Sequence, residues 1–527
     1  MGCFFAVLYI AFIGFLPLIY LMLKNLSFEK LKNKTFTKFL LKDFFRTVPV
    51  CALFSLPFLI APTITKPYLM FIQTVFMPLM FLELGHIYLF GTRIGLNTFY
   101  SFFVSNIRET REFISQNIPF ILYIGLFFFY ALPFYFLSFI PTFSYDSALT
   151  QISVVVIAIL LSIPFIRNLF KRWPKFKEAY VLNPFSNLVY HYIAYRKSYT
   201  ALRKKISEHK APDFDKISSK VTGKQTYVIV IGESANSMHF SCYGYPRNTN
   251  EFTDAFKNEI ISFSKVRSQF AQTMPSLEKA ISFADTEHPN FVYTKGSLID
   301  YFKQAGFKTY WLSNQYALDD TVITAMTIHA DYSKCFNYSG MKRFEKAGLD
   351  QDMLPDIQKI IDNDDEKKVI FVHLIGSHAA YINRYPSSFI HFSDKIPDKK
   401  LTDSNYQFLN SYDDSIRYTD WVLSEIISAL KKNNNINYLL YFSDHGEDVF
   451  DTDNKKLLGH SELANEPMTS IPLRLWLSSK LNEVRPDIKK RATHLDTPYK
   501  LEDVIHTIID ISSLSNSDYI PQKSILN

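Results

Sequence analysis

Long apolar runs fill the first third of the chain, and short apolar runs alternate with amphipathic ones in the remainder. Five of the early runs reach or approach the roughly 20 residues that a membrane-spanning helix needs. They lie at residues 4–23, 47–65, 68–91, 118–140 and 149–166. The first run has neither the basic start nor the small-residue cleavage site of a signal peptide. The pattern predicts an N-terminal α-helical membrane domain of about five spans, over residues 1–170.

Strand-like runs follow from Thr226 onward. Four are short and fully apolar, and helical patterns such as 297–305 and 415–432 separate them. The runs are residues 227–231, 309–312, 368–375 and 438–442. Such runs are typical of a mostly parallel sheet that helices cover on both faces. We therefore predict an α/β domain over residues 223–527, joined to the membrane domain by an amphipathic linker over 171–222.

The net charge of +7 comes largely from lysines beside the apolar runs, where anionic lipid headgroups are the simplest partner. No basic stripe with interleaved aromatic residues is present, so no nucleic-acid partner is expected. The segment Lys24–Arg46 carries seven basic and two acidic residues. The positive-inside rule would place this segment in the cytoplasm and, with five spans, residues 167 onward there too. An interfacial helix over Lys24–Arg46 is the alternative.

Four cysteines are present, without a C-x-x-C spacing. Neither a disulfide framework nor a cysteine zinc site is therefore expected. A single bridge between Cys242 and Cys335 stays open for a domain outside the cytoplasm.

Polar residues stand directly after three of the predicted strands. They are Glu233 after the first, His378 after the third, and the pair Asp444-His445 after the fourth. Strand ends of a parallel sheet share one edge, where ligands bind. A carboxylate at such an edge is costly unless it is paired or bound to a metal, and Glu, Asp and His are ligands of open zinc sites. The alternative is that each is a helix cap or a solvated loop residue.

Thr273 is the candidate nucleophile. It lies at or just before the start of a helical pattern that has Pro275 in its first turn. Free backbone N–H groups and the helix dipole at this position favour an alkoxide and bind phosphoryl oxygens. The alternative is a simple helix cap. Beside a zinc ion, the hydroxyl becomes a nucleophile.

Five motifs in order carry a family resemblance. They span residues 232–250, 305–315, 373–386, 410–420 and 442–448. Together they resemble the bacterial phosphoethanolamine transferases, which belong to the alkaline phosphatase/sulfatase superfamily. The low cysteine count and the Thr273–Glu278 segment look like the disulfide-poor branch that modifies the lipopolysaccharide core. The resemblance implies a sulfatase-like catalytic domain in the periplasm, held by a multi-pass anchor in the inner membrane.

The same resemblance implies a reaction and its partners. Phosphoethanolamine would pass from phosphatidylethanolamine, through a covalent phospho-threonine, to a lipid A phosphate or a core sugar or phosphate of lipopolysaccharide. Membrane lipids are the remaining partners, and the chain is expected to be a monomer. Periplasmic placement opposes the charge rule above.

The resemblance also implies roles for the residues of this sequence that match the motifs of the family. The expected ligands of the catalytic zinc are Glu233, Thr273, Asp444 and His445. Thr273 is the expected nucleophile and His378 its catalytic partner. His378 and His460 match histidines that contact the transferred phosphoryl group or a second zinc, and the number of zinc ions stays open. Asn106 and Glu109 match the loop that meets the donor headgroup.

Three rival functions remain. One is a phosphoglycerol transferase of the same superfamily that uses Mn²⁺. Another is a membrane-bound phosphatase or sulfatase-like hydrolase, although the Cys/Ser-x-Pro-x-Arg sulfatase signature is missing. The last is a membrane scaffold without activity, which the complete set of candidate ligands disfavours.

Overall fold

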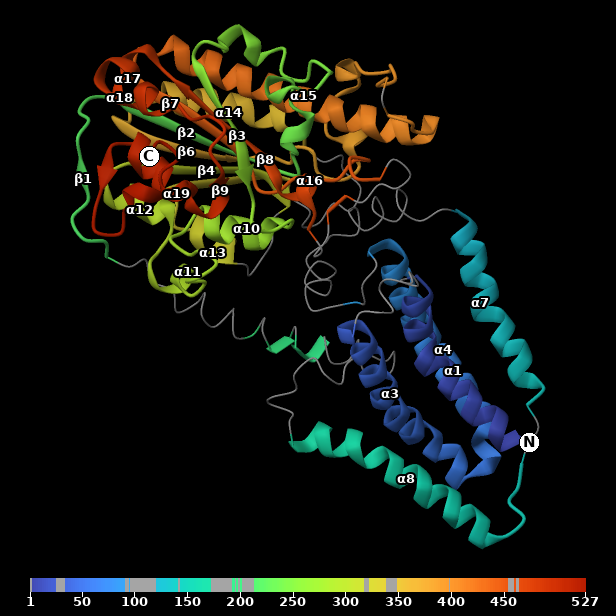
Figure 1. The fold of residues 1–527 in the computed structure, drawn as a ribbon. Helices are drawn as coiled ribbons and strands as arrows, with labels where there is room; N and C mark the ends of the chain where they lie inside the picture. Colours follow the sequence, from blue (N-terminus) through green and yellow to red (C-terminus); the bar gives the residue numbers. More distant parts are fainter. Residues whose placement is uncertain are drawn as a thin grey trace. The chain divides into compact units, whose positions relative to one another are not determined.

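The computed structural model forms two compact units, Met1–Tyr199 and Thr200–Asn527, and each is described here by itself (Figure 1). The described residues are 2–24, 34–90, 94, 120–140, 143–171, 192–194, 196–197, 200, 213–316, 322–337, 348–397, 399–453, 459–460 and 464–527.

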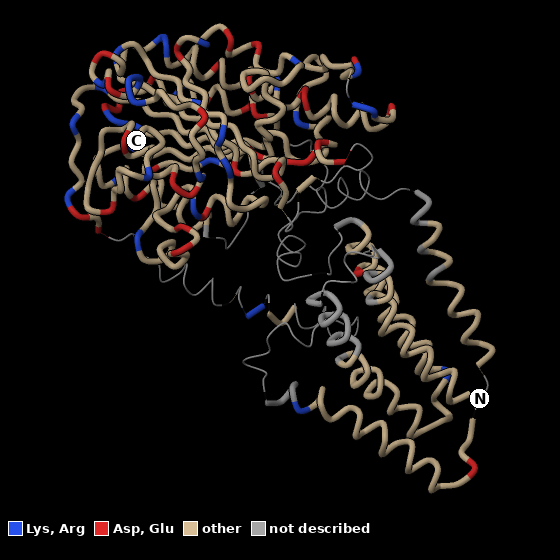
Figure 2. The backbone as a smooth tube through the Cα atoms, viewed as in Figure 1, with Lys and Arg blue, Asp and Glu red and all other residues tan. Residues whose placement is uncertain are grey.

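Long helices in the first unit coincide with the five apolar runs. They are α1 (Gly2–Lys24), α3 (Lys34–Ile60), α4 (Thr65–Phe90), α7 (Phe120–Ser138) and α8 (Ala148–Lys171). Helix α3 packs against α1 and α8, and α4 packs against α1 and α7. Charged residues are sparse along the described parts of these helices and abundant in the second unit (Figure 2).

Two helices among the described residues are long and apolar enough to cross a membrane, Pro62–Tyr88 and Ala148–Arg167. Gly2–Pro17 and Thr47–Ile60 are shorter apolar helices. The number of spans therefore stays a prediction. Helix α3 begins at Lys34, well before the predicted span at 47, and it ends at Ile60 because Pro62 opens the 3-10 turn η1 (Pro62–Ile64). Most of the linker 171–222 lies outside the described residues.

An eight-stranded sheet organises the second unit, in the order β5-β4-β6-β2-β7-β8-β3-β9. The strands are β2 (Gln225–Gly232), β3 (Ile260–Arg267), β4 (Lys308–Tyr316), β5 (Tyr332–Asn337), β6 (Lys367–His373), β7 (Ile436–Ser443), β8 (Ser470–Leu477) and β9 (Tyr499–Lys500). Every pairing from β5 to β7 is parallel. The sheet as a whole is mixed, because β8 runs antiparallel to β7 and β3. A separate pair joins β1 (Ser218–Ser219) to β10 (Leu514–Ser515).

Helices cover both faces of this sheet. One core lies under α10 (Thr273–Ala280), α12 (Leu298–Gln304), α13 (Val322–Thr327), α17 (Ser479–Val484), α18 (Asp487–Arg491) and α19 (Val504–Ile511). The other lies under α14 (Leu354–Asp362) and α15 (Asp403–Lys432). Two further short helices lie in the described part of this unit, α11 (Phe291–Thr294) and α16 (Glu466–Thr469). Strand β2 places Tyr227, Ile229 and Ile231 in the first core and Val228 and Val230 in the second, which explains its unbroken apolar run.

Short 3-10 turns connect these elements. They are η4 (Ser237–His239), η5 (Ser241–Tyr243), η6 (Thr253–Phe256), η7 (Asp350–Met353), η8 (Tyr381–Asn383), η9 (Ser387–Phe389), η10 (Leu501–Asp503) and η11 (Pro521–Lys523).

Helix α15 begins at Asp403, earlier than the predicted residue 415, because Thr402 caps it by accepting a hydrogen bond from the Asn405 amide. The bridge left open between Cys242 and Cys335 is not formed, since both are free.

Candidate metal centre

Neighbouring parallel strands deliver the first ligand candidates. Gly232, the last residue of β2, pairs in register with Ser443, the last residue of β7. Glu233 and Asp444 follow these two residues directly. Their side chains therefore leave the sheet at the same edge, as the sequence pattern predicts for parallel strands.

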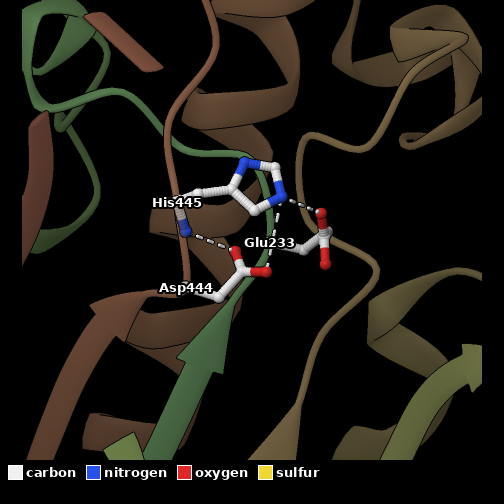
Figure 3. A group of neighbouring side chains, drawn as sticks. All are labelled: Glu233, Asp444 and His445. Atoms are coloured by element: carbon white, nitrogen blue, oxygen red, sulfur yellow. Dashed lines mark hydrogen bonds and ion pairs between the residues drawn. The ribbon is translucent and has the colours of Figure 1, made fainter. Parts of the chain in front are cut away.

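Glu233, Asp444 and His445 converge at this edge (Figure 3), where one ligand atom from each lies within 4.8 Å of the others. His445 Nε2 is 3.3 Å from Glu233 Oε1 and 3.5 Å from Asp444 Oδ2. All three residues are buried. A second bond orients the imidazole, since His445 Nδ1 lies 2.9 Å from the Gly446 carbonyl oxygen.

Thr273 is the first residue of α10, and its hydroxyl faces the cluster. Oγ1 lies 3.1 Å from Glu233 Oε2 and 3.5 Å from His445 Nε2. Gln272 occupies the N-cap position of the helix. The hydroxyl is therefore within reach of the ligand atoms and stands at a helix N-terminus, where backbone N–H groups bind phosphoryl oxygens.

Burial and mutual charge shift the pKa values of Glu233, Asp444 and His445. Burial opposes the charge of Glu233, but the hydrogen bond and charge of His445 outweigh it and hold the pKa of Glu233 below its usual range. Burial and the charge of Glu233 raise the pKa of Asp444. Burial disfavours charge on His445 as well, yet Asp444 and Glu233 raise its pKa. A proton on His445 thus offsets one negative charge of the two carboxylates, whereas a divalent cation would offset both.

One further observation indicates that these residues are suited to bind a zinc ion. Asp444 Oδ2 is buried and has no hydrogen-bond partner in the described part of the chain. Buried carboxylate oxygens are rarely left without a partner. Two carboxylates, an imidazole and a hydroxyl are suitable zinc donors, and four ligands suit its tetrahedral preference.

Two residues that were not singled out from the sequence as site residues hold the carboxylates in place. Ser234 Oγ donates to Glu233 Oε1 at 2.7 Å, and its backbone amide donates to Asp444 Oδ1 at 3.2 Å. Gln315 Nε2 donates to Glu233 Oε2 at 3.2 Å and to the Leu374 carbonyl at 2.7 Å. Gln315 stands near the C-terminal end of β4, so the rule of strand ends could have found it.

His378 lies in the loop after β6, and this loop is tied to Glu233. The Ser377 amide donates to the Glu233 carbonyl at 2.9 Å. Gly376 adopts φ +49°, and a Cβ there would meet the Glu233 carbonyl oxygen at 2.8 Å. The charge of His378 contributes to the lowered pKa of Glu233. His378 Nδ1 is buried without a hydrogen-bond partner among the described residues.

His460 also lies beside the cluster. Its ring centroid is 4.7 Å from that of His445, and its Nδ1 is 3.0 Å from Glu447 Oε1. The structure thus brings together Glu233, Thr273, Asp444, His445 and His460, with His378 on an adjoining loop. Asn106 and Glu109 lie outside the described residues.

The sulfatase family model matches residues 225–513, which include these ligand candidates. The chain belongs to the sulfatase family. It is 32% identical over 348 residues to phosphoethanolamine transferase EptC of Escherichia coli K12, an alignment that covers 64% of this chain and 59% of that protein. The same values hold for phosphoethanolamine transferase CptA of Salmonella typhimurium. The chain thus spans about three fifths of the length of these curated relatives.

Solved structures of phosphoethanolamine transferases also match this chain. The periplasmic domain of Escherichia coli EptC in complex with Zn matches with a TM-score of 0.56 and 31% identity, over 60% of this chain and 90% of that one. The integral membrane protein lipooligosaccharide phosphoethanolamine transferase A of Neisseria meningitidis matches with a TM-score of 0.68 and 18% identity, over 99% of this chain and 97% of that one. This second match shows the fold alone. The predicted family resemblance is confirmed by these relatives.

Proposed function

We propose that this chain is a zinc-dependent phosphotransferase that moves phosphoethanolamine from phosphatidylethanolamine to a lipopolysaccharide acceptor. One observation carries the proposal: the Thr273 hydroxyl stands at the start of α10, 3.1 Å from Glu233 and 3.5 Å from His445. The names of the relatives support the transferred group, and the zinc complex of Escherichia coli EptC supports the metal. Lipid A phosphate and core sugar or phosphate are both acceptors of the required chemistry.

The proposed function implies a membrane anchor, a linker and a catalytic domain. Residues 1–170 form a multi-pass anchor of about five spans in a bacterial inner membrane. Residues 171–222 link this anchor to a periplasmic catalytic domain over residues 223–527, and the chain acts as a monomer. An anchor in the donor's own membrane raises the effective donor concentration at the site.

Glu233, Thr273, Asp444 and His445 would hold the zinc ion. When bound, the ion lowers the pKa of the hydroxyl and stabilises charge on the phosphoryl oxygens. Thr273 Oγ, whose proton has passed to solvent beforehand, attacks the donor phosphorus as an alkoxide, and the phosphorus–oxygen bond to diacylglycerol breaks. Backbone N–H groups at the start of α10 offer further hydrogen bonds to the phosphoryl oxygens.

In this proposal His378 transfers the protons of the leaving group and the acceptor. Protonated His378 gives its proton to the departing diacylglycerol oxygen, and the neutral ring then takes the proton of the incoming acceptor hydroxyl. Attack by the acceptor releases Thr273. His460 Nδ1 lies 3.0 Å from Glu447 Oε1, and in this proposal His460 would contact the transferred phosphoryl group or a second zinc. Asn106 and Glu109 are proposed to bind the headgroup of the donor.

Mass spectrometry of the Thr273 peptide tests the proposal. Full-length protein incubated with phosphatidylethanolamine and zinc is expected to carry phosphoethanolamine on Thr273. Thr273→Ala should lose this adduct and all transfer, and Thr294→Ala, an exposed threonine on α11, serves as the control. Transfer retained in Thr273→Ala would refute the assignment. A glycerophosphate adduct would favour the phosphoglycerol transferase, and release of free phosphoethanolamine without transfer would favour the hydrolase.

The acceptor and the topology need separate tests. Lipopolysaccharide mass spectrometry of strains with and without the gene should show a phosphoethanolamine increment on lipid A or on the core. A reporter that is active only in the periplasm, fused to the C-terminus, should be active. An inactive reporter would support the charge rule and contradict the proposed orientation.

A further inference from the structure

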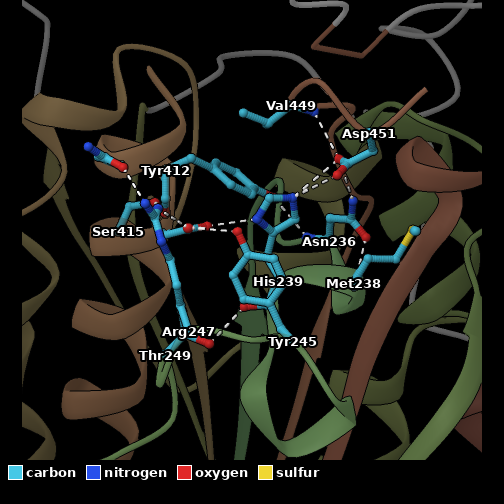
Figure 4. Close-up of polar contacts among 12 residues, drawn as sticks. Asn236, Met238, His239, Tyr245, Arg247, Thr249, Tyr412, Ser415, Val449 and Asp451 are labelled. Atoms are coloured by element: carbon cyan, nitrogen blue, oxygen red, sulfur yellow. Dashed lines mark hydrogen bonds and ion pairs between the residues drawn. The ribbon is translucent and has the colours of Figure 1, made fainter. Parts of the chain in front are cut away.

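A second cluster of buried charged side chains lies outside the proposed zinc ligands (Figure 4). At its centre is His239, in the turn η4 that follows β2. His239 Nδ1 lies 2.7 Å from Asp413 Oδ1 of helix α15, and Nε2 lies 3.2 Å from both carboxylate oxygens of Asp451. The side chains of His239 and Asp413 are 0% exposed, and that of Asp451 is 8% exposed.

Hydrogen-bond chemistry fixes the charge of this ring. An ionised carboxylate only accepts hydrogen bonds, and a neutral imidazole donates from one nitrogen only. Because both ring nitrogens of His239 face carboxylates, both carry hydrogen and the ring is an imidazolium. Burial disfavours this charge, but Asp451 and Asp413 outweigh burial and raise the pKa of His239 to about 9.

Each carboxylate has a further cation of its own. Arg247 Nη1 lies 2.6 Å from Asp413 Oδ2, and Lys399 Nζ lies 2.9 Å from Asp451 Oδ1. Among the described residues, two phenol rings also face His239, Tyr245 at 4.7 Å and Tyr412 at 4.9 Å between centroids.

The cluster joins three segments that are distant in sequence. His239 belongs to the loop after β2, Asp413 to α15 and Asp451 to the loop after β7. Asn236 strengthens the junction, since its Nδ2 donates to the Glu447 carbonyl at 3.0 Å and to Asp451 Oδ2 at 3.4 Å. The loop that carries Glu233 is therefore tied to the loop that carries Asp444 and His445.

Tyr412 carries the connection to the ligands. Its hydroxyl accepts from the Asn236 amide at 2.9 Å and donates to the Ser234 carbonyl at 2.7 Å. Ser234 has φ 59°, a conformation that costs energy for a residue other than glycine. The Ser234 amide in turn donates to Asp444 Oδ1. A displacement of α15 would thus reach the turn that presents Glu233.

We propose that His239 is a positioning residue of the metal centre: its imidazolium ties Asp413 to Asp451 and so fixes the loop of Glu233 against the loop of Asp444 and His445. The inference rests on the proposed function, because it presumes that these ligands hold zinc. His239 acts through its neighbours and takes no part in the chemical step.

Zinc affinity of the full-length protein tests this role. The outer partners of metal ligands typically affect affinity by about 10–100-fold, and His239→Gln is expected to weaken zinc binding by that factor in competition with a chromophoric chelator. His506→Gln is the matched control, since His506 is also a buried histidine, on α19, and accepts a bond from the Ile520 amide. It should leave zinc affinity unchanged. Thermal unfolding of both metal-free variants separates a general loss of stability from a loss at the metal centre.

A double variant tests the pairing itself. In His239→Gln/Asp451→Asn the amide at position 239 no longer faces the charge of Asp451, so the double variant is expected to lose no more zinc affinity than the worse single variant. Losses that multiply would show that the two residues act independently and would overturn the inference. Wild-type zinc affinity in His239→Gln would also overturn it, with the proposed function intact. A wild-type protein that binds no zinc would overturn both.

Discussion

Gln315 Nε2 lies 3.2 Å from Glu233 Oε2, the oxygen that also accepts the Thr273 hydroxyl at 3.1 Å. The other oxygen of Glu233 faces His445 Nε2 at 3.3 Å. Gln315 is itself fixed by its bond to the Leu374 carbonyl. The Glu233 carboxylate is thus oriented by the Gln315 side chain. An amide does not titrate, so this hydrogen bond does not depend on a change of protonation at Gln315.

Gln315→Leu should therefore weaken zinc binding while the fold persists. The substitution removes both bonds of the amide, so that Glu233 Oε2 keeps only the Thr273 hydroxyl as a donor among the described residues and the carboxylate is held less firmly. We expect a loss of about 10-fold in zinc affinity, in line with other outer partners of metal ligands. Chelator competition measures this loss. Gln358→Leu is the control, because Gln358 is a partly exposed residue of α14 whose amide donates to Asp362. Equal affinity in the two variants would contradict the positioning role of Gln315.

The sequence could predict that candidate ligands at strand ends lie close together, and the reason is geometric. Glu233 and Asp444 follow two apolar strands, and parallel pairing in register brings any such residues together. Gln315 obeys the same rule but was not singled out, because an amide is a poor zinc ligand and only its bond to Glu233 makes it relevant. Local pattern therefore identified the candidate ligands and missed the residues that donate hydrogen bonds to them.

Contacts of α15 could not be predicted in this way. Tyr412 and Asp413 meet the loop after β2 only because α15 packs across the sheet and starts early, at Asp403. Their positions depend on how a helix lies on a sheet, which a single sequence does not specify. The early start was missed because polar residues such as Asp413 and Asp414 hide the helical period, although both are buried.

Gly376→Ala should damage both the fold and the metal centre. Gly376 has φ +49°, and an added Cβ would lie 2.8 Å from the Glu233 carbonyl oxygen and 2.9 Å from its amide nitrogen. Backbone atoms cannot move aside as a flexible side chain can, so the turn at Glu233 must shift. Thermal unfolding and zinc competition are the two measurements.

Gly306→Ala provides the matched control for this substitution. Gly306 also has a positive φ, +83°, but a Cβ there would meet nothing within 4 Å. Alanine in this conformation costs about 1–2 kcal/mol of stability, without any change in zinc affinity. Gly376→Ala should cost more stability than this and reduce zinc affinity as well. Equal behaviour of the two variants would mean that the approach of Gly376 to Glu233 is unimportant.

Asp444→Asn should have opposite effects with and without zinc. In the metal-free protein Asp444 is buried beside Glu233, and its Oδ2 has no hydrogen-bond partner among the described residues. An amide removes the repulsion and still accepts the bonds from the Ser234 and His445 amides. We expect a gain on the order of 1 kcal/mol in metal-free stability.

With zinc present the order reverses. Zinc at about 1,000 times its dissociation constant stabilises a protein by about 4 kcal/mol, and loss of a charged ligand removes most of that gain. Unfolding of wild-type protein and Asp444→Asn, each with zinc and with chelator, gives the four values. A variant less stable than wild type under both conditions would contradict a site built to hold a cation.

Acid should destabilise the second unit through His506, a residue of α19, which covers one face of the sheet. His506 is 4% exposed, and its Nδ1 accepts from the Ile520 amide at 3.2 Å, which requires an unprotonated nitrogen. Burial, then the charge of Lys523, lowers the pKa of His506 from 6.5 to about 4. The unfolded chain therefore takes up a proton before the folded protein does. Stability from this group is complete above pH 6.5 and is lost as the pH falls toward 4.

His506→Gln removes this titration and keeps an oxygen that can accept from Ile520. A shift of this size corresponds to about 3 kcal/mol, so wild-type protein should lose up to about that much stability relative to the variant between pH 6.5 and pH 4. Denaturant unfolding followed by tryptophan fluorescence, at several pH values, measures the difference. Both proteins share the metal centre, so acid release of zinc cancels in the comparison. A difference that stays constant with pH would show that His506 is protonated, or exposed, in the folded protein.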